Sequence, residues 1–116
     1  MTDWAGIVAL YDVLGRVSPS PVVALNRAVA LGMRDGAETG LAAITALLAQ
    51  GNLDRYHLAH AARADMLRRL GRVEAAQGAY QRAFELARQP AERRFLQARL
   101  NELAGGSAST AKTTNA

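Results

Sequence analysis

The chain has 116 residues, which suffices for one domain with a single core. Half of its residues are hydrophobic but only six are aromatic, and the apolar content is mostly Ala and Leu, which favours an all-α fold. The absence of cysteine excludes disulfides and thiolate metal sites, and no apolar run approaches the roughly 18 residues of a membrane span. The start, Met1 to Trp4, lacks the basic and apolar regions of a signal peptide, so we expect a cytoplasmic protein.

The net charge of +4 is unevenly distributed along the chain. Residues 1–54 carry three Arg against five acidic residues, whereas residues 55–104 carry ten Arg against five. Thirteen of the fourteen basic residues are Arg, which suits bidentate contacts to carboxylate or phosphate. Solvated helix faces are the simpler explanation of the same composition.

The first predicted helix begins after Thr2, its expected N-cap, and ends before Pro19. Its inner face is predicted to hold Ile7, Leu10, Tyr11 and Leu14. The second helix follows the Ser20-Pro21 start signal, runs to about Met33, and is apolar nearly all round, so neighbours should cover it. The third, about Ala37 to Gln50, follows the Asp35-Gly36 turn and ends at Gly51. Its predicted buried residues are Leu41, Ile44, Leu47 and Leu48.

Three further helices are predicted, from about Asp54 or Tyr56 to Leu70, from Val73 to Arg88 and from Pro90 to Ala104. Gly71 suits the end of the first of them, and Pro90 stops the second. The inward residues are expected to be Ala76, Tyr80, Ala83 and Phe84, followed by Phe95, Leu96, Leu100 and Leu103. Residues 1–104 therefore form one domain, and residues 105–116, rich in Gly, Ser, Thr and Ala, are predicted to be a disordered tail.

The strongest signal is internal repetition. Residues 56–88 resemble a tetratricopeptide (TPR) unit, a helix pair with a period of about 34 residues, with small Ala64 before the Gly71 turn and aromatic Tyr80 after it. Arg27-Ala28 parallels Arg63-Ala64 and Ile44 parallels Tyr80, both at a spacing of 36 residues. The pattern predicts an antiparallel helix-pair solenoid made of a half unit, two full units and a capping helix.

A solenoid of this kind presents a concave face lined by the first helix of each unit. The candidate partner-binding residues on those helices are Leu25, Asn26, Val29, Asp65, Arg68 and Arg69. Arg27 and Arg63 occupy equivalent places on otherwise apolar helices. We expect each to clamp a carboxylate or the carbonyls at a neighbouring helix C-terminus, and the alternative is that they receive an acidic partner.

No catalytic, cofactor-binding or metal-binding residues can be named, so we do not expect an enzyme. His57 and His60 could share a helix face, but a metal site needs a third ligand, and packing or lining a groove is the preferred interpretation. A basic series over the last three helices could contact nucleic acid: Arg68, Arg69, Arg72, Arg82, Arg88, Arg93, Arg94 and Arg99. Because Glu74, Glu85, Glu92 and Glu102 are interleaved with it, surface ion pairs are expected instead of DNA contact.

Several segments in combination resemble the C-terminal extension of bacterial extracytoplasmic-function (ECF) sigma factors that carry an additional TPR-like domain. They are Asp3-Trp4 with Leu10-Tyr11, Pro19 to Ala30, Tyr56 to Arg72 and Ala91 to Leu96. The resemblance implies a non-catalytic domain that acts in transcription initiation by contacting the sigma regions of the same polypeptide, RNA polymerase, or a small YCII-like accessory protein. The alternative is a stand-alone TPR adaptor that binds a peptide or protein unrelated to transcription.

Overall fold

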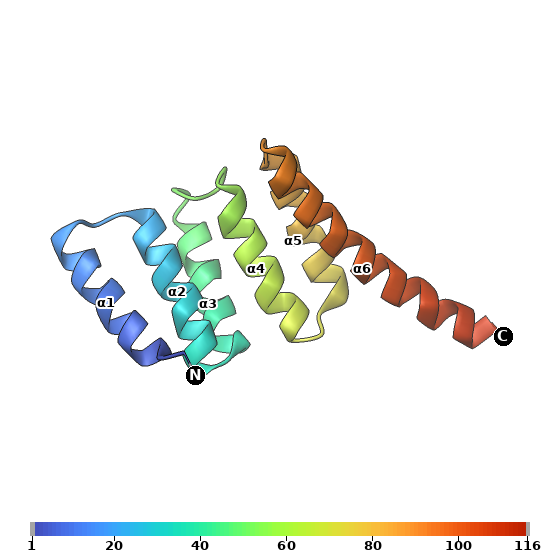
Figure 1. The fold of residues 1–116 in the computed structure, drawn as a ribbon, viewed down its shortest axis with the longest axis horizontal. Coiled ribbons are helices and arrows are strands. Elements are labelled where there is room, and N and C mark those ends of the chain that lie inside the picture. The colour runs from blue at the N-terminus through green and yellow to red at the C-terminus, as the bar shows by residue number, and fades with distance from the viewer. Residues whose placement is uncertain (1, 116) are drawn as a thin grey trace.

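The computed structural model describes the backbone of residues 2–115, with side-chain exposure through Gly105, and this range contains six α-helices and no strand (Figure 1). The all-α prediction is confirmed. The helices are α1 Trp4–Val17, α2 Pro21–Asp35, α3 Ala37–Ala49, α4 His57–Arg69, α5 Val73–Leu86 and α6 Pro90–Asn115.

The helices form a row in which each one packs on the next along the chain, and α2 also contacts α4 (Figure 1). The row is elongated, with extents of 58 × 31 × 25 Å. Its radius of gyration is 15.6 Å, above the about 13 Å of a compact domain of this length. The architecture is the predicted solenoid, in which α1 is the half unit, α2–α3 and α4–α5 are the full units and α6 is the final helix.

Glycine enables the turns that separate these helices. The backbone φ angles of Gly36, Gly51 and Gly71 are 114°, 88° and 76°. Residues that carry a Cβ rarely adopt φ angles in this range. Ser20 caps α2 as predicted, because its hydroxyl accepts a hydrogen bond from the Val22 N–H at 3.2 Å.

The N-cap predicted for α1 is wrong by one residue. The helix begins at Trp4, so Asp3 rather than Thr2 occupies the capping position. The Asp3 carboxylate accepts a hydrogen bond from the Gly6 N–H at 3.0 Å.

The buried core repeats at the predicted spacing. Ala28 and its equivalent Ala64 are both buried, as are Ile44 and its equivalent Tyr80, and all four are at most 2% exposed. Small residues at the first pair of positions let neighbouring helices approach, and large residues at the second fill the space between units. The register of the repeat is therefore confirmed.

The helices α2 and α3 approach each other closely where Gly32 of α2 faces Gly40 of α3. A Cβ placed on Gly40 would lie 2.7 Å from the Gly32 Cα, and one placed on Gly32 would lie 2.8 Å from the Met66 Cε. Both glycines are buried inside helices, so they do not form turns. Their lack of a side chain allows the two helices to pack closely. This contact was not predicted from the sequence.

The predicted inner face of α1 is wrong for two of its residues. Leu10 and Leu14 are exposed, as are Val13 and Val17, while Ile7 and Tyr11 are half-buried and Val8 is the buried residue of this helix. The physical reason is that α1 packs mainly on α2, so one of its two apolar faces has no neighbour in the described structure.

Phe95 of α6 is likewise 55% exposed, although it was predicted to point inward. Leu96 is buried and Leu100 and Leu103 are partly buried against the core, as expected. Since α6 packs mainly on α5, only the side of α6 that carries Leu96 is fully covered.

The helix α6 continues to Asn115, whereas a disordered tail was predicted from residue 105. Gly105 does not adopt a positive φ and no proline follows it, so the helical hydrogen bonding of the backbone is not interrupted. The side chains beyond Gly105 lie outside the described part of the structure. In the part that is described, no helix combines the length and apolar character needed to cross a membrane.

Candidate functional site

One groove lies on the face formed by α2, α4 and α6. All six residues that were predicted from the sequence to contact a partner line it. Its volume is about 460 Å³. The predicted members are Leu25, Asn26, Val29, Asp65, Arg68 and Arg69, and the structure adds Leu58, Ala61, Ala62, Tyr80, Phe95 and Arg99. The six predicted residues lie together because α2 and α4 are the first helices of their units and present the same face.

A single carboxylate organises two arginines on α4. Asp65 accepts hydrogen bonds from Arg68 Nη2 at 2.5 Å and from Arg69 Nε at 3.0 Å, which the i,i+3 and i,i+4 spacings allow. The Arg68 Nε also donates to the Tyr80 hydroxyl at 3.3 Å. These two hydrogen bonds, the one to Asp65 first, raise the pKa of Arg68 above its ordinary value, so this guanidinium is held charged.

Arg99 brings a third guanidinium to the groove from α6. Its Nη1 donates to a Glu102 carboxylate oxygen at 3.0 Å, and its guanidinium carbon lies 5.1 Å from the centre of the Phe95 ring. Its Nε is buried and has no acceptor among the described residues. The chain itself covers this Nε, whereas the Arg99 side chain as a whole is 30% exposed, so a group from outside the chain would contact the exposed part of the guanidinium.

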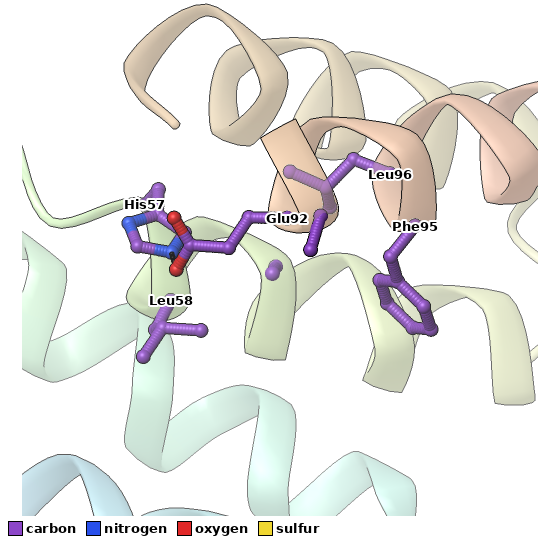
Figure 2. A pocket seen from close by; sticks show the side chains of 7 residues that line it. His57, Leu58, Glu92, Phe95 and Leu96 are labelled. Carbon is purple, nitrogen blue, oxygen red and sulfur yellow. Dashed lines mark ion pairs between the residues drawn. The ribbon is translucent and has the colours of Figure 1, made fainter. Parts of the chain in front are cut away.

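An apolar pocket of about 290 Å³ continues the groove beyond Phe95 (Figure 2). Leu58 and Phe95, which it shares with the groove, are 46% and 55% exposed. At its other end His57 Nε2 lies 2.7 Å from a Glu92 carboxylate oxygen, outside hydrogen-bond geometry, so the contact joins α4 to α6 by charge when the imidazole is protonated. His57 therefore lines the apolar pocket that adjoins the groove, which agrees with one of its two predicted roles.

The two histidines do not converge on one point. His60 Nε2 lies 2.7 Å from the Asp54 carbonyl oxygen, while His57 faces Glu92. Within the described residues no three His, Cys, Asp or Glu side chains gather in a way that could hold a metal ion.

The predicted arginine clamp is present in one unit but not in the other. Arg27 Nε donates to an Asp12 carboxylate oxygen at 2.5 Å and joins α2 to α1. Arg63 makes no hydrogen bond or ion pair within the described structure, so the clamp predicted for it is wrong. The residue 36 positions after Asp12 is Leu48, which gives Arg63 no carboxylate, and Arg63 is only half-buried.

The clamp on a helix C-terminus is made instead by Arg93 of α6. Its Nη1 donates to the carbonyl oxygens of Phe84 at 3.0 Å and Ala87 at 3.1 Å, and its guanidinium carbon lies 3.9 Å from the centre of the Phe84 ring. Because those carbonyls end α5, a positive charge is favourable there.

Other arginines of the basic series pair with carboxylates from neighbouring units. Arg72 donates to Glu38 at 2.9 Å, and Arg82 lies 3.9 Å from Asp54. The basic stripe is thus interrupted by ion pairs, although Glu102 is the only one of the four interleaved glutamates that takes an arginine partner in the described residues.

The fold and this groove define a helical-repeat domain. No protein-family model matches the chain, and no solved structure matches it. The chain is similar to an uncharacterized protein of Rhizobium meliloti (strain 1021), with 40% identity over 111 residues. The matched segment covers 96% of the chain but 26% of the relative, so the chain spans about a quarter of the length of that protein.

Proposed function

We propose that the chain is a non-catalytic protein-interaction domain, the C-terminal TPR-like extension of an ECF sigma factor that acts in transcription initiation in the bacterial cytoplasm. The observation that carries the protein-binding role is the groove, because six residues chosen for partner contact from the repeat pattern line one continuous surface. Its partners would be the sigma regions of the same polypeptide, RNA polymerase, or a YCII-like accessory protein.

The chemistry of the groove supports binding rather than catalysis. Its lining is apolar side chains, three arginines, Asn26 and Tyr80, with Asp65 as the one carboxylate. Both oxygens of Asp65 are taken by arginines, so this carboxylate is poorly placed to act as a general base. Exposed Leu58 and Phe95 supply the apolar contact area that protein partners bury.

The sigma-factor assignment is supported by the segments that carry the resemblance. Leu25-Asn26 and Tyr56-His57-Leu58 contribute residues to the groove and its apolar pocket, and Arg27 holds α2 against α1. The relative is about four times as long as the matched segment, which suits a domain that works inside a longer polypeptide.

The test uses the complete polypeptide encoded by the reading frame that contains this chain. We expect it to bind core RNA polymerase in size-exclusion chromatography and to direct transcription from a promoter upstream of its own gene. Asn26→Ala combined with Arg69→Ala should weaken a contact of this domain and change transcript yield, whereas Arg94→Ala, outside the groove, should not. A polypeptide that neither binds polymerase nor supports transcription would favour the stand-alone adaptor.

A further inference from the structure

We propose that the groove is polarised, and that it receives a partner helix carrying a large apolar side chain at one end and carboxylates about three turns away. The inference rests on the protein-binding role proposed above and adds the chemistry and direction of the partner. It follows from the different character of the two ends of the groove along α4.

The apolar end lies at the N-terminus of α4. There Leu58, Ala61, Ala91 and Phe95 line a pocket, and the His57–Glu92 pair lies at its other end (Figure 2). The small alanine side chains in this lining leave room for one large apolar side chain from outside. An aromatic or aliphatic anchor in such a pocket is the usual centre of a protein interface.

The basic end lies at the C-terminus of α4. Arg68, Arg69 and Arg99 face a single lining carboxylate, Asp65, and Asp65 is already shared between Arg68 and Arg69. Glu102 engages only the Nη1 of Arg99, whose side chain is 30% exposed. The excess of positive charge at this end favours a carboxylate, which forms strong charge-assisted hydrogen bonds with guanidinium groups.

The distance between the ends sets the length of the partner. Leu58 and Arg68 are ten residues apart on α4, which at about 1.5 Å per residue is about 15 Å. A partner helix lying along α4 spans this distance in about three turns. Because the two ends differ in chemistry, only one orientation places the apolar anchor and the carboxylates correctly.

A protein helix fits this surface better than nucleic acid does. A phosphate backbone would need cationic contacts along its whole path, but half of the groove is apolar and Asp65 stands among its arginines. An acidic amphipathic helix can place an apolar side chain in the apolar half of the groove and carboxylates beside the arginines of the other half.

The test selects helix-forming peptides from a phage-displayed random library on the immobilised 116-residue chain. We expect the recovered sequences to pair a large apolar residue with Asp or Glu about ten residues away. Synthetic peptides made from the recovered sequences then serve as fluorescent probes, each compared with a peptide in which the acidic residues are moved next to the apolar residue. The rearranged peptide should bind more weakly, since it cannot reach both ends of the groove at once.

Variants assign each end of the probe to its site. Arg99→Ala removes a charged donor and should weaken binding about tenfold, with the loss disappearing when the acidic residues of the probe are replaced by amides. Phe95→Ala should also weaken binding about tenfold, with the loss tied to the apolar residue of the probe. Arg94→Ala, an exposed arginine of the same helix outside the groove, is the matched control and should bind as the unchanged chain does. Circular dichroism checks that each variant is folded.

Three outcomes would overturn the inference: recovery of no binding peptide, peptides without acidic residues, or equal binding by the Arg99→Ala and Arg94→Ala variants. Displacement of the probe by short duplex DNA would assign the basic end to nucleic acid instead. These results are independent of the polymerase-binding test, so a failure of the sigma-factor assignment and a failure of the polarised groove can be told apart.

Discussion

Replacing Tyr80 by alanine should lower the free energy of unfolding by about 3–5 kcal/mol. Tyr80 is 1% exposed and belongs to the core cluster that joins the two full units. An aromatic side chain buries about 150–250 Å². At about 25 cal/mol per Å² this is worth about 4–6 kcal/mol, from which the part retained by alanine and the burial already present in the unfolded chain are subtracted.

This loss is a large fraction of the whole free energy of unfolding, which is about 6–17 kcal/mol for a domain of this length. Urea denaturation followed by far-ultraviolet circular dichroism measures it. The matched control is Phe95→Ala, an aromatic truncation at a half-exposed site, which should cost about 1 kcal/mol or less. A loss below about 1 kcal/mol for Tyr80→Ala, or equal losses for the two variants, would refute the assigned register of the repeat.

Three further predictions concern packing and surface contacts. Gly40→Ala should destabilise by about 1–3 kcal/mol, because the new methyl would lie 2.7 Å from the Cα of the facing glycine of α2. Gly78→Ala, which meets open space, should stabilise by about 0.5–1 kcal/mol, and urea denaturation of both variants tests the pair. Arg93→Ala should cost about 1–3 kcal/mol through its lost bonds to two carbonyls, against less than about 0.5 for Arg94→Ala, and similar melting temperatures would contradict the clamp. Val17→Lys should change stability by less than about 0.5 kcal/mol since Val17 is 77% exposed, and a large drop in melting temperature would show that this side chain is covered.

The positions of the helices and turns were predictable because their signals are local. Gly36, Gly51 and Gly71 each stand where a helix pattern stops, and each has the positive φ that favours glycine. The repeat also related residues that are 36 positions apart. Because Ile44 and Tyr80 occupy equivalent positions in their units, both were predicted to be buried, and both are. The groove members on α2 and α4 followed from the same equivalence.

The sequence was a poor guide to the ends of the stack, because burial there depends on how many neighbours a helix has. Leu10 and Phe95 fit apolar periodicities as well as any core residue does, but α1 and α6 each pack mainly on one helix. Leu58 and Arg99 became groove residues only through the placement of α6 beside α4, which no spacing encodes. The missing clamp at Arg63 was foreseeable, since extending the repeat to Leu48 shows that its carboxylate partner is absent.

The row of helices also determines how this chain acquires its structure. Each helix packs mainly on the one that follows it in sequence, so the contacts between helices join segments that are neighbours along the chain. Chains with such local contacts fold within about microseconds to milliseconds, because little loop-closure entropy is lost before contacts form. Inside a longer polypeptide, the units can therefore assemble one after another as they leave the ribosome, each new helix pair docking on a surface that the previous pair has already completed.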